Sequence, residues 1–126
     1  MILTRKYTFQ AARKLTKINQ DHICANLHGH TFKITIKIKG PLNKKNDFVI
    51  DFFDIDKIFD NSIFKVLDHK YLNKIDGLDS PTTEKLAIWI WGNLIDNLPL
   101  LVEVSVFEND LYGCTYKGDW SLCMAN

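Results

Sequence analysis

Residues 31–39, Thr31-Phe32-Lys33-Ile34-Thr35-Ile36-Lys37-Ile38-Lys39, alternate between polar and apolar side chains without a break. Phenylalanine and isoleucine hold the even positions, and threonine and lysine hold the odd ones. This alternation is typical of a strand with one face buried and the other in water. Gly40 and Pro41 follow and should end the strand. The stretch therefore predicts one strand of a half-buried sheet.

Further alternating stretches lie on either side of it. Over residues 3–12 the odd positions are mostly apolar, and Arg5 is the exception. Near the other end, alternating valines lie within residues 102–106, and residues 112–117 can return as a hairpin partner. A short strand is also expected over residues 48–50. Together these strands predict a sheet with one apolar face.

Two helices are expected between the strand pairs. The first has apolar residues at three- and four-residue spacing over residues 55–66, and Asp51 or Asp54 could cap it. The second has Ser80 as a candidate N-cap, a proline at its first position, and an apolar-rich body over residues 82–98. The order β-β-α-α-β-β predicts an α+β fold, with two helices on one face of an antiparallel sheet.

The composition predicts a single globular domain over residues 1–126. Apolar residues make up 46% of the chain and charged residues 25%, which argues against disorder. With 16 Lys and Arg against 15 Asp and Glu, the formal net charge is +1, which argues against a general binder of nucleic acid backbones. No apolar run approaches the roughly 18 residues of a membrane span. We therefore expect neither a nucleic acid nor a membrane partner.

Cysteine content indicates the redox environment of the protein, and chain length indicates where a binding site could lie. Cys24, Cys114 and Cys123 cannot all pair within one chain, and the first six residues lack the long apolar stretch of a signal peptide. We therefore expect a reduced, cytoplasmic protein. A domain of this length buries about two thirds of its unfolded-chain surface. Little room remains for a deep private pocket, which favours a site shared between subunits.

Three of the four histidines crowd into residues 21–30. If the phase of residues 31–39 continues backwards, His28 and His30 project from the same face as Phe32 and Ile34. Two imidazoles that project together suit zinc, whose tetrahedral sites favour imidazole and thiolate ligands. The alternative is a pair of loop histidines with ordinary hydrogen bonds. A zinc site would also need a third protein ligand from elsewhere.

Four other side chains could carry chemistry, and each also has a purely structural interpretation. Cys24 could be a thiolate nucleophile, base or ligand, or an inert small hydrophobe. Asp68 could orient and charge His69 for proton transfer, or the two could simply lie on the surface. Glu108 continues the phase of Val106 and should face the buried side, where it could accept two adjacent N–H donors of a heterocycle. Otherwise it turns to solvent.

Seven segments in this order resemble the 6-pyruvoyltetrahydropterin synthase family, most closely its bacterial branch, the 6-carboxytetrahydropterin synthases of the queuosine pathway. The resemblance covers nearly the whole chain, and the ordered set is highly specific. The segments are Phe9-Gln10-Ala11-Ala12, Cys24-Ala25-Asn26-Leu27-His28-Gly29-His30, Val49-Ile50-Asp51-Phe52, Leu67-Asp68-His69-Lys70-Tyr71-Leu72-Asn73, Gly77-Leu78-Asp79-Ser80-Pro81-Thr82-Thr83-Glu84, Trp89-Ile90-Trp91 and Gly113-Cys114-Thr115-Tyr116-Lys117-Gly118.

The resemblance implies the tunnelling fold, in which small subunits join their sheets into a barrel. The assembly is commonly a homohexamer made of two trimers, with active sites between subunits. It also implies a carbon–oxygen lyase that converts 7,8-dihydroneopterin triphosphate to 6-carboxytetrahydropterin, with loss of acetaldehyde and triphosphate.

The resemblance also implies three kinds of role by position. The proton-transferring thiolate and its acid/base partners are Cys24, Asp68 and His69. The ligands of a zinc cofactor are His28 and His30. The pterin edge is anchored by Glu108, with help from Thr82 and Thr83.

Two positions depart from the family. After the Phe-x-Ala-Ala motif the family has a histidine, its third zinc ligand, but this chain has Arg13, and Asn109 stands where the family usually has threonine. Arginine has no lone pair to offer and cannot ligate zinc. Arg13 either faces the site from the side of Phe9 and Ala11, or swings to solvent beyond a strand that ends at Ala12.

Three consequences of Arg13 are open. The two histidines could hold zinc with Cys24 or His22 as a substitute ligand. Arg13 could itself supply positive charge near the substrate oxygens and make catalysis independent of a metal. The pterin pocket could also persist without the synthase step, which would leave a pterin-binding homologue with lost or altered activity.

Overall fold

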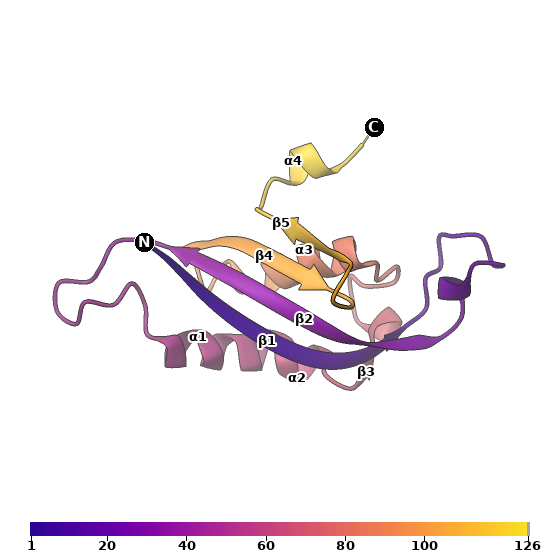
Figure 1. Ribbon diagram of the computed structural model, residues 1–126, viewed down its shortest axis with the longest axis horizontal. Coiled ribbons are helices and arrows are strands. Elements are labelled where there is room, and N and C mark those ends of the chain that lie inside the picture. The colour runs from indigo at the N-terminus through magenta and orange to yellow at the C-terminus, as the bar shows by residue number, and fades with distance from the viewer. Residues whose placement is uncertain (126) are drawn as a thin grey trace.

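The computed structural model describes residues 1–125, which form a five-stranded sheet in the order β3-β1-β2-β4-β5 (Figure 1). The long strands β1 (Ile2–Arg13) and β2 (His28–Lys39) pair antiparallel along their whole length. β4 (Leu101–Phe107) pairs with β2, and β5 (Gly113–Tyr116) closes a hairpin with β4. These pairings confirm the antiparallel sheet. The two-residue β3 (Lys70–Tyr71) was not expected and runs parallel to β1.

The core lies between the apolar face of this sheet and the helices. The alternation of residues 31–39 is confirmed, because the four even positions of this stretch, Phe32, Ile34, Ile36 and Ile38, are at most 1% exposed. They belong to one cluster with Ile55 and Phe59 of α1 (Phe52–Phe59) and with Leu86 and Ile90 of α3 (Thr83–Leu94). Burial of this apolar surface is the main stabilising term, at roughly 25 cal/mol per Å².

The first predicted helical region is helical throughout but irregular. α1 continues into a π-helical turn, η2 (Asp60–Phe64), and then into α2 (Lys65–Leu67). Asp51, one of the two expected caps, is the N-cap, and its carboxylate accepts a hydrogen bond from the Phe53 N–H at 2.9 Å. The region ends at Leu67, directly before Asp68, so it positions the Asp68-His69 pair at the edge of the sheet beside β3.

The start and end of the second predicted helix were wrong. Thr82, not Ser80, is the N-cap, and its hydroxyl accepts from the Lys85 N–H at 3.1 Å. Pro81 therefore lies outside the helix. α3 ends at Leu94 because the chain turns there, and the N–H of Leu98 still bonds to the Leu94 carbonyl while its side chain stays in the core. Apolar spacing alone does not separate a helix from such a buried turn.

Four smaller differences concern strands and short helices. Residues 48–50 form no strand, and β1 extends one residue beyond Ala12 to include Arg13. A register shift at Lys37 and Ile38 places Leu101 in the core, where Val102 was expected. Three short elements had no sequence signal: η1 (Ile23–Ala25), η3 (Leu72–Lys74) and α4 (Trp120–Cys123). Within residues 1–125, none of the helices combines the length and apolarity that a membrane crossing requires.

Candidate active site

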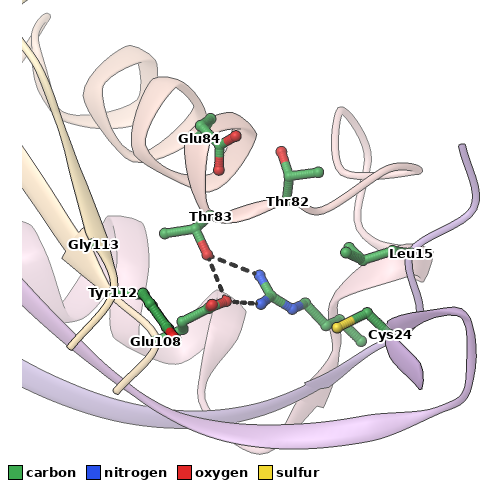
Figure 2. Close-up of a pocket in the computed structure, with 9 residues that line it drawn as sticks. Leu15, Cys24, Thr82, Thr83, Glu84, Glu108, Tyr112 and Gly113 are labelled. Atoms are coloured by element: carbon green, nitrogen blue, oxygen red, sulfur yellow. Dashed lines mark hydrogen bonds and ion pairs between the residues drawn. The ribbon is translucent and has the colours of Figure 1, made fainter. Parts of the chain in front are cut away.

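Arg13, the last residue of β1, is the centre of a buried polar network. Its side chain is 2% exposed, and its guanidinium forms an ion pair with Glu108, which directly follows β4. Nη1 donates to the Pro81 carbonyl at 3.1 Å and to the Thr83 hydroxyl at 3.2 Å. The Thr83 hydroxyl in turn donates to Glu108 Oε2 at 2.9 Å (Figure 2). The network ties the end of β1 to the start of α3 and the end of β4.

The charges in this network shift two pKa values. Partial burial acts to raise the pKa of Glu108, but hydrogen bonds from Thr83 and Arg13 outweigh it, and the pKa lies below its ordinary value. The pKa of His30 is lowered, first by burial and then by the positive charge of Arg13. Glu108 is therefore a carboxylate and His30 favours its neutral form at neutral pH.

A cavity of about 240 Å³ opens beside this network, and we call it the Glu108 cavity. Figure 2 shows Cys24 and Leu15 on one side of it, with Glu108 and Tyr112 on the other. The residues that line it are Arg13, Leu15, Cys24, Thr82, Thr83, Glu84, Glu108, Tyr112 and Gly113. The thiol and the carboxylate singled out in the sequence therefore meet at one cavity.

Cys24 is held there by the turn η1. The His22 imidazole caps this turn, because its Nδ1 accepts a hydrogen bond from the Cys24 N–H at 3.0 Å. The Cys24 carbonyl accepts from the Leu15 N–H at 2.9 Å, which ties the two sides of the loop together. Asn73 fixes the start of the loop through two hydrogen bonds with the backbone of Lys14, at 2.9 and 2.7 Å. The thiol is half-buried and unpaired.

A second cavity, of about 440 Å³, lies where β1, β2 and β3 meet, and we call it the His69 cavity. The residues that line it are Gln10, Ala11, Ala12, Gly29, His30, Thr31, His69, Lys70 and Tyr71. His69 Nδ1 lies 2.8 Å from Asp68 Oδ2, and Asp68 Oδ1 accepts from the Gln10 N–H at 3.0 Å. The Gln10 N–H and His69 together lower the pKa of Asp68. Asp68 is thus an anchored carboxylate that orients an exposed imidazole.

The backbone of His69 is itself unusual, with φ of 58°. Non-glycine residues rarely adopt this conformation, and where they do, the surroundings must hold them there. Here the His69 N–H bonds to the Gln10 carbonyl of β1. This bond holds the backbone of His69 against β1, beside the His69 cavity.

His28 and His30 project from the same face of β2, as expected, with ring centroids 4.8 Å apart. His28 Nδ1 lies 2.7 Å from the Asn26 carbonyl, an arrangement in which Nδ1–H donates and Nε2 keeps its lone pair. In the part of the chain that the structure describes, the Nε2 atoms of both rings are buried without a hydrogen-bond partner. The pair therefore offers two imidazole lone pairs.

A comparison with known protein families matches residues 2–119 to the model described as 6-pyruvoyl tetrahydropterin synthase. The chain belongs to this family. It is 40% identical over 90 residues to the dihydroneopterin monophosphate aldolase of Pyrococcus furiosus, covering 69% of this chain and 75% of the relative. It is 33% identical over 112 residues to the 6-carboxy-5,6,7,8-tetrahydropterin synthase of Synechocystis, covering 85% of each chain. Family members therefore carry more than one named activity.

Solved structures agree with the fold. The 6-pyruvoyl tetrahydropterin synthase of Caenorhabditis elegans superposes with a TM-score of 0.87 at 24% identity, covering 94% of this chain and 96% of that one. The Plasmodium vivax 6-pyruvoyl tetrahydropterin synthase superposes with a TM-score of 0.67 at 17% identity, covering 92% and 97%. The α+β fold expected from the order of strands and helices is therefore confirmed.

The resemblance to the 6-pyruvoyl tetrahydropterin synthase family implied a zinc site, but the residues present in this chain do not fit one. A zinc site takes at least three protein ligands, and among residues 1–125 no group of three His, Cys, Asp or Glu side chains could hold a metal ion. The idea that Cys24 or His22 completes the site is therefore wrong. Arg13 fills the remaining position and has no lone pair. No chemical step can be assigned to a metal here.

Two structural alternatives from the sequence are also wrong. Arg13 does not swing to solvent, because the strand continues through it and buries it. Glu108 does not turn to solvent either, since its side chain is only 23% exposed and is paired with Arg13. Both interpretations failed for the same reason: each charged group supplies the partner that makes burial of the other tolerable.

Several wall residues of the Glu108 cavity were missed. Glu84 lies in the first turn of α3, so its place after Thr83 was a usable signal. Leu15 and Tyr112 reach the cavity from loops, and nothing in their spacing indicated it. The bond from Thr83 to Glu108 was not foreseen, although both residues were expected to bind the same ligand.

Proposed function

We propose that the chain is a 6-carboxytetrahydropterin synthase, a lyase of queuosine biosynthesis that acts in the cytoplasm. It would convert 7,8-dihydroneopterin triphosphate, with water, to 6-carboxytetrahydropterin, acetaldehyde and triphosphate. One observation carries the proposal: a thiol, Cys24, and a carboxylate, Glu108, line the same cavity. The Synechocystis relative, which matches 85% of the chain, supports this choice among the family's activities.

In this proposal, Glu108 holds the pterin through its N–H edge. Arg13 and Thr83 both contact Oε2, and in the described chain no residue hydrogen-bonds to Oε1. A carboxylate can accept two parallel N–H donors, which recognises a flat guanidine-like edge. Oε1 would take one donor, and the Thr83 hydroxyl would yield its share of Oε2 to the other. The Thr82 hydroxyl, at the rim of the same cavity, would help to orient the ring.

Cys24 would remove a proton from the substrate side chain, and the Asp68-His69 pair would return one. General acid–base catalysis of this kind contributes typically 10²–10⁴-fold. Cys24 lies at the Glu108 cavity, whereas His69 lies at the His69 cavity. We therefore propose that a second copy of the chain brings its His69 to this Cys24, within a homohexamer made of two trimers. A single chain would then hold two half-sites.

A pterin-binding homologue with lost or altered activity is the second candidate, and the place of Arg13 opposite His28, at a ligand position of the family's zinc, favours it. Arginine cannot ligate zinc, so the synthase step would be lost or altered while the pocket persists. The 40% identical Pyrococcus relative, named as an aldolase, supports altered chemistry in particular. An aldolase breaks a carbon–carbon bond of the side chain and releases no free triphosphate.

Incubation of the purified protein with 7,8-dihydroneopterin triphosphate separates these candidates. The synthase releases triphosphate and acetaldehyde in equal amounts, and Cys24→Ala should lower the rate by at least about 100-fold. Cys114→Ala is the matched control, because burial raises the pKa of the Cys114 thiol to about 11 and Cys114 lies outside the Glu108 cavity. Absence of triphosphate release would reject the synthase.

If no product forms, pterin binding still distinguishes the second candidate. Quenching of pterin fluorescence should then depend on Glu108 and should not change in Cys24→Ala. Carbon–carbon cleavage without triphosphate release would identify an aldolase instead.

A further inference from the structure

Arg13 stands where the sheet would place a third ligand beside His28 and His30. In the β1–β2 register Arg13 is directly opposite His28, and Ala11 is directly opposite His30. Residues directly opposite each other in an antiparallel pair project from the same face, with Cβ atoms about 5 Å apart. The side chain of Arg13 therefore leaves the sheet on the side of the two imidazoles.

The two histidines are prepared to donate lone pairs. The Asn26 carbonyl takes the Nδ1–H of His28, which fixes the ring and leaves Nε2 as an acceptor. Nε2 of His30 is buried without a partner in the described residues, as is Nε2 of His28. Buried polar atoms without a partner are costly, and two of them on one face of β2 mark a place where a ligand could bind.

Arg13 prevents these lone pairs from binding a metal in two ways. Its guanidinium offers only donors, and it stays charged at any pH at which the protein is folded. A divalent cation beside the imidazoles would therefore meet a fixed positive charge. The guanidinium also cannot easily move away, because Pro81, Thr83 and Glu108 hold it and its side chain is 2% exposed.

We propose that Arg13 is a built-in cation that replaces a metal ion, so that His28 and His30 bind no zinc in this chain. The guanidinium supplies a permanent positive charge at the inner end of the Glu108 cavity and holds Glu108 in place. The chain has thus exchanged a three-ligand metal position for an arginine–carboxylate pair. This inference concerns metal affinity and does not depend on which reaction the chain catalyses.

Zinc titration against a chromophoric chelator tests the proposal, with Arg13→His as the decisive variant. The variant adds a third imidazole on the same face of the sheet as His28 and His30 and removes the charge. Loss of even an outer partner of a ligand typically weakens metal binding 10–100-fold, so a gained ligand should strengthen it at least about 100-fold. We expect one zinc per chain in Arg13→His, only weak binding in the natural chain, and loss of the gain in Arg13→His combined with His28→Ala.

Arg13→Gln is the matched control, because it removes the charge without adding an imidazole, and its amide oxygen is not among the ligands that zinc prefers, so zinc binding should stay weak. Circular dichroism establishes that each variant is folded. If Arg13→His does not fold, zinc binding by the natural chain, compared with zinc binding by His28→Ala, decides the question. One tightly bound zinc that disappears in His28→Ala would overturn the proposal, whereas weak binding that His28→Ala leaves unchanged would support it.

Discussion

The two cavities hold different halves of the proposed chemistry, and they are built differently. At the Glu108 cavity the charged groups are internal, with side-chain exposures of 2% for Arg13 and 23% for Glu108. At the His69 cavity the carboxylate is covered to a similar extent, with 19% for Asp68, but its partner is open, with 77% for His69. The proposed ligand anchor is therefore part of the core, whereas the imidazole that is proposed to return a proton lies at a surface edge. An edge of this kind can serve a neighbouring copy.

The largest expected effect is on turnover, when Cys24 of one cavity or His69 of the other is replaced. Cys24→Ala and His69→Asn should each lower the turnover of 7,8-dihydroneopterin triphosphate by about 10²–10⁴-fold. Asparagine is chosen because it tolerates the positive φ of His69. If each site takes its Cys24 and its His69 from different copies, an equal mixture refolded together should regain about a quarter of the natural activity, because one site in four has both intact residues.

The control for this mixture is the double variant Cys24→Ala with His69→Asn, mixed with the natural chain in equal amounts. About a quarter of its sites should also be intact, so both mixtures should give similar rates. Mixed oligomers that contain both single variants but regain no activity would show that a site takes both residues from one copy.

The second expected effect is on folding. Glu108→Ala leaves a buried guanidinium without its carboxylate, and breaking a buried pair costs 3–5 kcal/mol. Because Glu108 is 23% exposed, we expect a loss of about 3 kcal/mol in the free energy of unfolding. His69→Asn should leave the urea midpoint almost unchanged, since its side chain is exposed. Equal losses in the free energy of unfolding of Glu108→Ala and His69→Asn would contradict the distinction between the two cavities.

The sequence predicted the fold better than the network at Arg13. Alternation in residues 31–39 located β2 and its buried face, because a period of two leaves one set of side chains for the core. The alternation of the first strand assigned Arg13 to the side of Phe9 and Ala11, but a side chain in solvent beyond the strand end was an equal alternative. Burial of an arginine depends on a partner 95 positions away, Glu108, and local spacing carries no information on that pairing.

The site was predicted in its parts and not in its arrangement. Family resemblance selected Cys24 and Glu108, and the structure brings both to one cavity. The place of the His69 cavity depends instead on how β3 joins the edge of β1, a pairing of two residues that no periodicity indicates. The roles assigned to these residues remain predictions.

A smaller effect is expected from Thr83→Val, which removes the hydroxyl shared by Arg13 and Glu108 while keeping the shape of the side chain. A buried hydrogen-bonding group that loses its partner costs about 1–3 kcal/mol. We expect a loss of about 2 kcal/mol in the free energy of unfolding, because both partners are charged but keep each other. Thr115→Val is the matched control: its hydroxyl bonds to the uncharged Ser105 hydroxyl on the sheet, and its loss should be smaller.

The smallest expected effect is a dependence of stability on pH. The pKa of Glu108 is lower in the folded chain than its ordinary value of about 4.3, so the unfolded chain takes up the proton first as the pH falls. The stabilisation is complete above that ordinary value and is lost as the pH drops through the folded pKa. Glu108→Gln lacks this titration. The difference in urea midpoint between the natural chain and Glu108→Gln should therefore shrink between pH 7 and pH 3, and a constant difference would show that the carboxylate charge does not stabilise the buried Arg13.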